Sequence, residues 1–206
     1  MAQERFMEIN REDYKLRETN YVKLETPKDK IVLMNTLNSG MAHVTGWKNR
    51  MDGQHKYTSA FTIDRDGTIH QHYDPKYHSK IFNKNVDERI IPISLVNYGH
   101  LKMENPETGF ITWLRDIYNG EEVFEKRWRG YRYWEPYTEE QKKSAVSLIE
   151  ALCETFDIER DSAPSNIKID SPEAFKGIMY RSNFDKYYCD LSPAWDFTLF
   201  TIKETV

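Results

Sequence analysis

Residues 30–34, which read KIVLM, limit the folds that this chain can adopt. Ile31 and Val32 are β-branched, and a short uninterrupted apolar run of this kind is typical of a strand buried on both faces of a sheet. The segment that follows, residues 40–51, places large apolar side chains three and four positions apart. That spacing predicts a helix with one buried face. A buried strand followed by a helix indicates the first unit of an α/β fold.

Three downstream segments have equally regular patterns. Residues 57–73 predict a β-hairpin, because β-prone runs flank the turn at 64–67, whose Asp-Gly pair supplies the positive φ of a tight turn. Residues 89–97 form another β-rich run, in which Pro92 favours an edge strand or a bulge, since proline cannot donate a ladder hydrogen bond. Thr138 to Gln141 form a capping box for a long helix with a regular apolar face.

The remaining segments have weaker patterns. Residues 110–125 have the spacing of a short helix, residues 127–137 indicate an aromatic and basic loop, and residues 180–197 indicate a polar loop that carries function. Together the elements predict an α/β fold with a single mixed central β-sheet flanked by helices. We expect residues 1–28 to be an N-terminal arm and residues 29–206 to be the main domain.

Composition excludes several classes of protein. The chain has 206 residues, enough for one domain with a sizeable core, and its formal charge of -4 offers no broad cationic field for nucleic acid. No apolar stretch approaches the ~20 residues that span a bilayer. The first residues lack the apolar run of a secretory signal, and the two cysteines make no disulfide framework. We therefore expect a protein made in the cytoplasm, with no membrane span and no nucleic-acid partner.

Five segments together resemble the zinc-dependent N-acetylmuramoyl-L-alanine amidase family, which includes the peptidoglycan recognition proteins. They are KIVLMNT, TIDRDGTIHQH, ISLVNYG, the helix that begins YTEEQKK, and DLSPAWDF. They occur in family order over roughly residues 30–200, which makes the match more specific than any one motif. The NYG and SPAWDF features resemble phage-encoded members most. The resemblance implies an amidase-like fold.

In active members of this family, two histidines and one aspartate or cysteine hold a zinc ion that activates water for amide hydrolysis. Such a site needs neutral imidazoles and an anionic third ligand, which together lower the pKa of the bound water to about 7. The identity of the ligands is therefore decisive.

Most positions that match the family's functional residues hold other side chains here. The first histidine falls on Met34 or Asn35, the catalytic glutamate on Ser94, the second histidine on Arg181 and the assisting lysine on Tyr188. Only the acidic ligand has a counterpart, Asp190. Arginine cannot ligate zinc, because it stays protonated and has no lone pair to donate. The resemblance therefore implies that zinc is absent unless another site is built around Asp190.

Two alternatives could restore catalysis. His70 and His72 alternate onto one face of a strand, with His78 close behind, and could form a replacement metal site or simply be polar-face residues. Cys189 could act as a nucleophile if a histidine lay beside it. Cys153, on the apolar side of the long helix, is expected to be a small core residue.

The expected ligand-contacting residues are Asn35, Trp128, Tyr133, Trp134, Arg181 and Asp190. Arg181 could pair with Asp190 and fill the space of the metal, or could bind a carboxylate of a peptide stem. The aromatic residues at 128–134 could stack on sugar rings or anchor their segment against the long helix. The arginines between them suit either a solvated face or an anionic polymer.

We therefore expect an amidase-fold protein, phage-encoded, that has lost zinc-dependent catalysis and needs no cofactor. It would bind peptidoglycan or a related cell-wall glycopeptide, or serve as a virion component in contact with other virion proteins. The alternative is an active, zinc-dependent peptidoglycan-hydrolysing endolysin with a divergent site around Asp190.

Overall fold

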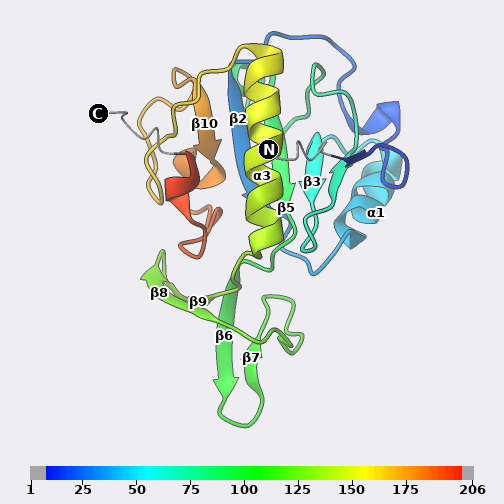
Figure 1. Cartoon of the computed structure of the whole chain (residues 1–206). Helices are drawn as coiled ribbons and strands as arrows, with labels where there is room; N and C mark the ends of the chain where they lie inside the picture. The colour runs from blue at the N-terminus through cyan, green and yellow to red at the C-terminus, as the bar shows by residue number, and fades with distance from the viewer. Residues whose placement is uncertain (1–7, 201–206) are drawn as a thin grey trace, which may run out of the picture.

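A computed structural model describes residues 8–200, which form two β-sheets and the helices around the larger one (Figure 1). The larger sheet is mixed, with strand order β1-β4-β3-β5-β2-β10. Its strands are β1 (Ile9–Asn10), β2 (Lys30–Asn35), β3 (Phe61–Ile63), β4 (Ile69–Gln71), β5 (Ile90–Leu95) and β10 (Gly177–Tyr180). The predicted α/β class, a mixed central sheet flanked by helices, is confirmed.

Strand β2 lies in the middle of the parallel part of this sheet, between β5 and β10. All six of its residues are buried, as its apolar run predicts. Ile31 and Leu33 pack into the larger hydrophobic cluster, whereas Val32 and Met34 pack into a second cluster on the other face. Each fully buried aliphatic side chain contributes roughly 1.5–3 kcal/mol, so the strand is fixed from both sides.

The prediction that Pro92 marks an edge strand or a bulge is wrong, because β5 pairs with β2 on one side and β3 on the other. The carbonyl of Pro92 accepts a hydrogen bond from the N–H of Ala60 at 2.9 Å, so this residue's polar groups face β3. Strand β3 begins its pairing one residue later, at Phe61 opposite Ile93. The missing N–H of Pro92 therefore falls just outside the β3 ladder, where it costs little.

Three α-helices accompany the large sheet in the described part of the chain: α1 (Ala42–Asn49), α2 (Lys84–Asp87) and α3 (Glu139–Phe156). The capping box of α3 is present, with the Gln141 N–H donating to Thr138 Oγ1 at 3.1 Å and the Thr138 N–H to Gln141 Oε1 at 3.3 Å. Helix α3 crosses the face of β2 and β5 (Figure 1) and buries Leu148 and Ile149 there. The predicted helices at 40–51 and after Thr138 are both confirmed.

The β3–β4 hairpin is confirmed, and the N-terminal segment lies against it. Strand β1 pairs in parallel with β4, and the N–H of Leu16 donates to the His72 carbonyl at 2.9 Å. Tyr21 is buried and stacks on Tyr73 with ring centroids 4.7 Å apart. Residues 1–7 of the expected arm lie outside the described residues.

The second sheet is antiparallel and has the order β7-β6-β9-β8. Its strands are β6 (His100–Asn105), β7 (Gly109–Ile111), β8 (Phe124–Trp128) and β9 (Tyr131–Trp134). It extends away from the large sheet, between β5 and α3 in the chain (Figure 1).

Two predictions for this second sheet are wrong. Residues 110–125 form no helix, because the helically spaced Trp113 and Leu114 remain 48% and 45% exposed and so mark no buried face. Residues 127–137 are largely strand, because Arg129 and Gly130 adopt φ values of 48° and 86° and make a tight turn between β8 and β9. None of the helices within residues 8–200 is long and apolar enough to cross a membrane.

Candidate functional site

The site positions inferred from the sequence meet at the ends of β2 and β10. Asp190 is 3% exposed, and its Oδ2 accepts the backbone N–H of Asn35 at 3.0 Å. Strand β10 ends at Tyr180, opposite Leu33, so the N–H of Asn35 lies beyond its neighbouring strand. The carboxylate of Asp190 therefore continues the hydrogen bonding of β2 where β10 stops.

Arg181 lies beside this carboxylate. Its Nη1 is 3.5 Å from Asp190 Oδ2, and its side chain is only 17% exposed. The guanidinium carbon lies 4.0 Å from the centre of the Tyr188 ring and 5.6 Å from that of Tyr57. Aromatic faces attract a cation, so the two tyrosines stabilise a charge that has lost most of its water. Of the two roles considered for Arg181, the structure shows the ion pair with Asp190.

Burial and pairing act in opposite directions on these two charges. Burial lowers the pKa of Arg181, but the Asp190 carboxylate and the neighbouring tyrosines together raise it by more. The net shift of this pKa is upward, so the guanidinium remains charged. Burial raises the pKa of Asp190 above its ordinary value, and Arg181 and the Asn35 N–H only partly offset that effect. The ion pair is therefore a structural element that depends on both partners.

The structure separates the two candidates for the first histidine position. Met34 pairs with Ser94 across β2 and β5, and its Sδ accepts a hydrogen bond from the Ser59 hydroxyl at 3.8 Å. Asn35 points to the opposite face, because side chains alternate along a strand. Met34 belongs to the cluster against which Tyr57 packs, the ring beside Arg181. Met34, and not Asn35, therefore lies on the face of β2 that carries this cluster.

Ser94, at the position of the family glutamate, lies in a buried hydroxyl pair. Its Oγ is 2.5 Å from the Oγ of Ser59, and both residues are at most 1% exposed. A serine hydroxyl has no proton-accepting strength near neutral pH comparable to that of a carboxylate. This position therefore holds no general base.

Asn35 is held on the other face of β2. Its Oδ1 accepts the hydroxyl proton of Tyr137 at 2.7 Å, and the Tyr137 oxygen accepts the N–H of Ser192 at 3.3 Å. The Asn35 Nδ2 has no hydrogen-bond partner among the described residues. Sequence patterns gave no indication that Tyr137 joins the end of β2 to the C-terminal loop.

Arg129, at the tip of the β8–β9 hairpin, binds the C-terminal loop directly. Its guanidinium donates to the carbonyls of Ser182 at 3.0 Å and Asp185 at 2.8 Å, and also to that of Tyr188. It also lies over the ring of Trp128, 4.6 Å from the ring centre. The second sheet therefore braces the loop that carries Arg181 and Asp190. The sequence indicated only an arginine among aromatic residues.

The expected aromatic contacts differ in exposure. Trp134 has no exposed surface and donates its Nε1–H to the Lys126 carbonyl at 2.7 Å, so its ring is core. Trp128 is partly buried and donates to the carbonyl of Asn166 at 2.9 Å. Tyr133 lines a cavity on the second sheet, and its neighbour Tyr131 is 38% exposed. The aromatic segment thus divides into anchors and exposed rings.

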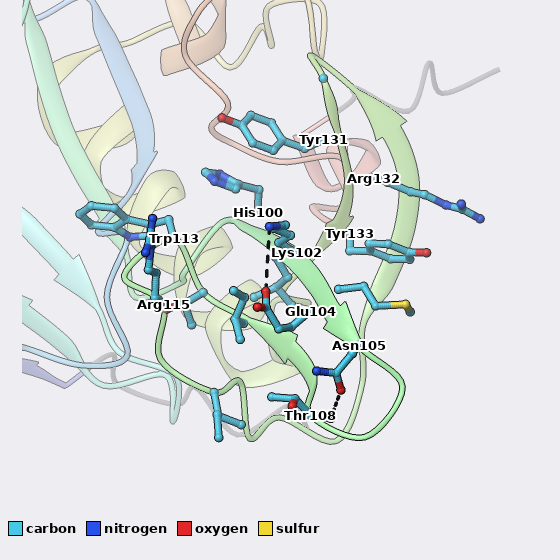
Figure 2. Close-up of a pocket in the computed structure, with 16 residues that line it drawn as sticks. His100, Lys102, Glu104, Asn105, Thr108, Trp113, Arg115, Tyr131, Arg132 and Tyr133 are labelled. Atoms are coloured by element: carbon cyan, nitrogen blue, oxygen red, sulfur yellow. Dashed lines mark hydrogen bonds and ion pairs between the residues drawn. The ribbon is translucent and has the colours of Figure 1, made fainter.

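This cavity has a volume of about 1070 Å³ and is formed by β6, β7, β9 and residues 111–117. Figure 2 shows its labelled side chains around β6. Those that carry aromatic rings or charge are His100, Lys102, Glu104, Trp113, Arg115, Tyr131, Arg132 and Tyr133. No pattern in the sequence indicated a cavity here.

Residues 25–177 match the family model described as N-acetylmuramoyl-L-alanine amidase. The chain belongs to this amidase family. Its sequence matches none of the curated proteins with which it was compared.

Several solved structures are similar at low sequence identity. A mutant endolysin from Bacillus subtilis is 16% identical, covers 84% of each chain and has a TM-score of 0.47. The N-acetylmuramoyl-L-alanine amidase LysC from Clostridium intestinale URNW is 15% identical, covering 84% of this chain and 81% of its own, with a TM-score of 0.44. The amidase AmiD from E. coli is 10% identical, covering 68% of this chain and 48% of its own, with a TM-score of 0.43.

The side chains at the family's metal-binding positions do not fit a zinc ion. A thioether from Met34 and a protonated guanidinium from Arg181 stand where neutral imidazoles are required. The Oδ2 of Asp190 already accepts from Asn35 and contacts Arg181. Within residues 8–200, no group of three or more His, Cys, Asp or Glu side chains could hold a metal ion.

The residues considered for a rebuilt site are held elsewhere. His70 and His72 both meet Tyr14, the first through a ring contact at 4.8 Å and the second through its Nδ1, 2.8 Å from the Tyr14 carbonyl. Burial and the Asp190 charge raise the pKa of the Cys189 thiol, which is opposite to the shift that a nucleophile needs. Cys153 is buried in the main core, as expected.

Proposed function

We propose that this amidase-family protein binds cell-wall peptidoglycan and has lost zinc-dependent hydrolysis. The observation that carries the proposal is the Arg181–Asp190 ion pair, at 3.5 Å, where the family's second histidine and acidic ligand would meet. Family membership supports a peptidoglycan-type ligand.

The replacement is consistent across the site. In a zinc site the metal supplies the positive charge that balances the acidic ligand, and here Arg181 supplies that charge. Tyr188, at the position of the assisting lysine, stacks on the guanidinium instead of adding a second cation. Met34 and Ser94 provide neutral neighbours on the same face. Each change suits an arginine, and none supplies a ligand of the family's zinc site.

Metal content and wall hydrolysis test the loss of catalysis. Purified full-length protein is incubated with excess Zn²⁺, desalted and measured by mass spectrometry for metal, then mixed with purified sacculi. We expect far less than one zinc per chain and no release of muramoyl-linked peptides, while the protein co-sediments with the sacculi. Stoichiometric zinc together with peptide release would establish the active amidase instead.

A gain-of-site variant sharpens this test. Met34→His combined with Arg181→His restores two imidazoles beside Asp190, the ligand set of the active family. We expect this double variant to retain zinc after desalting and to show a higher melting temperature with zinc than without, because a ligand that binds only the folded state stabilises it. The single variant Arg181→His, with Met34 unchanged, is the matched control and should bind zinc much more weakly.

A place in a phage particle is part of the same proposal. It is supported by the NYG and SPAWDF features that resemble phage-encoded members. Detection of the protein in purified particles, at a constant ratio to capsid protein through a density gradient, tests it. Recovery only in the unassembled fraction would count against a virion role.

A further inference from the structure

We propose that the cavity on the four-stranded sheet is a binding site for an anionic oligosaccharide, a glycan strand whose sugars carry carboxylates. The proposal rests on the proposed function in taking the cell wall as the source of this glycan. It goes further by placing recognition on β6, β9 and the segment 111–117, away from Arg181 and Asp190.

The size of the cavity favours an extended ligand. Its volume of about 1070 Å³ slightly exceeds the range of about 300–1,000 Å³ that is usual for small-molecule sites. Three strands and the segment 111–117 contribute to its walls. A single sugar would leave most of this space to water, whereas several linked rings could fill it.

Two aromatic rings are both exposed and fixed in orientation. Trp113 is 48% exposed, yet its Nε1–H donates to the Leu37 carbonyl at 2.8 Å. Tyr131 is 38% exposed and stacks on His100, with centroids 3.8 Å apart and planes at 24°. An aromatic face packs well against the apolar face of a sugar ring, and a fixed ring loses little conformational entropy on binding. These residues therefore form preorganised stacking surfaces.

The charge of the cavity is opposite to that of the whole protein. Lys102, Arg115 and Arg132 line it against one acidic residue, Glu104, although the chain has a net charge of -4. Arg132 is paired with Glu125, and the Lys102–Glu104 contact is long, at 3.9 Å. Arg115 is exposed and takes part in none of the ion pairs formed by the described residues. A free guanidinium beside aromatic faces suits a carboxylate on a sugar.

A buried hydroxyl gives an independent indication of a ligand. Thr112 lines the cavity and is 3% exposed, and its Oγ1 has no hydrogen-bond partner among the described residues. Its backbone is fixed, because its N–H donates to the Asp116 carbonyl at 2.9 Å. Buried polar atoms in folded proteins are nearly always hydrogen-bonded. A ligand hydroxyl that reaches the cavity wall at Thr112 would give this atom a partner.

Side chains in Figure 2 fit this arrangement. His100, Trp113, Arg115 and Tyr131 lie on one side of β6 in this view together with the Lys102–Glu104 ion pair, whereas Arg132 and Tyr133 lie on the other. The rings and the free cation thus face one region, where stacking and charge can act on the same ligand.

The experiment measures the affinity of full-length protein for three soluble probes by titration calorimetry. The probes are muramic-acid-containing glycan strands without peptides, neutral oligomers of N-acetylglucosamine, and poly(glycerol phosphate), which has charge but no sugar rings. We expect the muramic-acid glycan to bind most tightly, and its affinity to weaken with added salt. Equal or tighter binding of either other probe would overturn the assignment of an anionic glycan.

Variants locate the site. Tyr131→Ala and Arg115→Ala should each weaken glycan binding about tenfold, whereas Tyr131→Phe should bind like the parent because it keeps the ring. Tyr187→Ala and Lys143→Ala remove an exposed ring and an exposed cation outside the cavity and should leave affinity unchanged. Melting temperatures of all variants establish that they fold. Parent-like binding by both Tyr131→Ala and Arg115→Ala would overturn the proposal.

These outcomes separate this proposal from the proposed function. If the parent binds sacculi but the cavity variants bind them equally well, the cavity assignment fails and peptidoglycan binding stands. If the parent does not bind sacculi but binds the soluble glycan, and Arg115→Ala and Tyr131→Ala weaken that binding, the cavity assignment stands and the peptidoglycan claim fails. A parent that binds no probe overturns the cavity assignment.

Discussion

Arg181 and Arg115 show how differently two regions of this molecule treat a positive charge. Arg181, at the ends of β2 and β10, is paired with a buried carboxylate, covered by Tyr188 and 17% exposed. Arg115, in the segment 111–117 that follows β7, is exposed at the wall of an open cavity. The groups at the ends of β2 and β10 are therefore buried and paired with one another, whereas the groups around the cavity are exposed to a ligand.

The two regions are also physically joined. Arg129 binds three carbonyls of the C-terminal loop, and Trp113 donates to Leu37, two residues beyond the end of β2. The second sheet and the segment 111–117 therefore hold two loops in place, the loop that follows β2 and the C-terminal loop that carries Arg181 and Asp190. Substitutions in the two regions should therefore have different effects. Those around Arg181 and Asp190 should lower the free energy of unfolding, and those in the cavity should weaken ligand binding.

The largest effect is expected from Asp190→Ala. It leaves the Arg181 guanidinium without its counter-charge and the N–H of Asn35 without its acceptor, both in a buried setting. Removing one partner of a buried ion pair typically costs about 3–5 kcal/mol. Urea unfolding of the parent and the variant measures this loss in the free energy of unfolding.

A double-mutant cycle identifies the cause. Arg181→Met alone and Asp190→Asn alone should each destabilise the fold, whereas the two changes combined should recover much of the loss, because no unpaired buried charge remains. Additive effects of the two single changes would show that the pair is not a unit. Such a result would remove the contrast between Arg181 and Arg115.

A smaller effect is expected from Arg129→Ala, which cuts the link between the regions. Hydrogen bonds to a charged group contribute about 1.5–3 kcal/mol, and partial exposure of Arg129 places its loss of stability near the lower end, about 2 kcal/mol. Limited proteolysis should then cleave within residues 182–188 faster than in the parent. Arg129→Lys is the control, and it should rescue little, because an ammonium lacks the planar fork that reaches several carbonyls. Full rescue by lysine would show that only the charge matters.

Sequence patterns predicted the parts of the fold that depend on local periodicity. The buried run of β2, the β3–β4 hairpin and the capping box of α3 are each encoded within a few consecutive residues, and each was confirmed. The second sheet was missed because its turn depends on Arg129 at positive φ and its strands carry exposed aromatic residues without a clear alternation. The core position of Trp134 was missed for a related reason, since the burial of a tryptophan depends on the elements that cover it.

The site shows the same limit. The replacements at Met34, Ser94 and Arg181 could be recognised by position, and the ion pair with Asp190 was one of two alternatives left open. The contacts of Arg129 could not be found, because its acceptors lie 53 to 59 residues further along the chain. Their meeting depends on how the second sheet packs, which no local pattern specifies.

The dependence of stability on pH tests whether His43 and His72 are kept from water as Arg181 is. Burial lowers the pKa of His43 to about 4 and that of His72 to about 3, from the ordinary value near 6.5. Below pH 6.5 the unfolded chain therefore binds protons that the folded chain excludes, so stability should fall as pH falls toward 4. The expected slope is about 1.4 kcal/mol per pH unit for each histidine, and it should vanish above about pH 7.

Urea unfolding at about pH 7.5, 6 and 5 measures this slope, because the first value lies above the free histidine pKa near 6.5 and the other two lie below it. His72→Gln removes one titrating group and should make the slope smaller in this range. The remaining slope then reports His43 together with His55, His70 and His100, whose pKa values burial also lowers. A parent protein equally stable at all three pH values would show that water reaches these imidazoles. The interior around the large sheet would then exclude water less well than the buried Arg181–Asp190 pair indicates.

The smallest effect on stability, and the sharpest contrast with Asp190→Ala, is expected from Arg115→Ala. Surface substitutions away from buried contacts usually change the free energy of unfolding by no more than about 0.5 kcal/mol, and Arg115 is exposed. Its loss should instead flatten the salt dependence of glycan binding, because one cation that attracts the anionic ligand is gone. Arg115→Lys keeps the charge and should keep most of that dependence. If Arg115→Ala destabilised the fold as strongly as Asp190→Ala, Arg115 would be a structural residue like Arg181. The contrast between a buried, paired arginine and an exposed, ligand-binding one would then not hold.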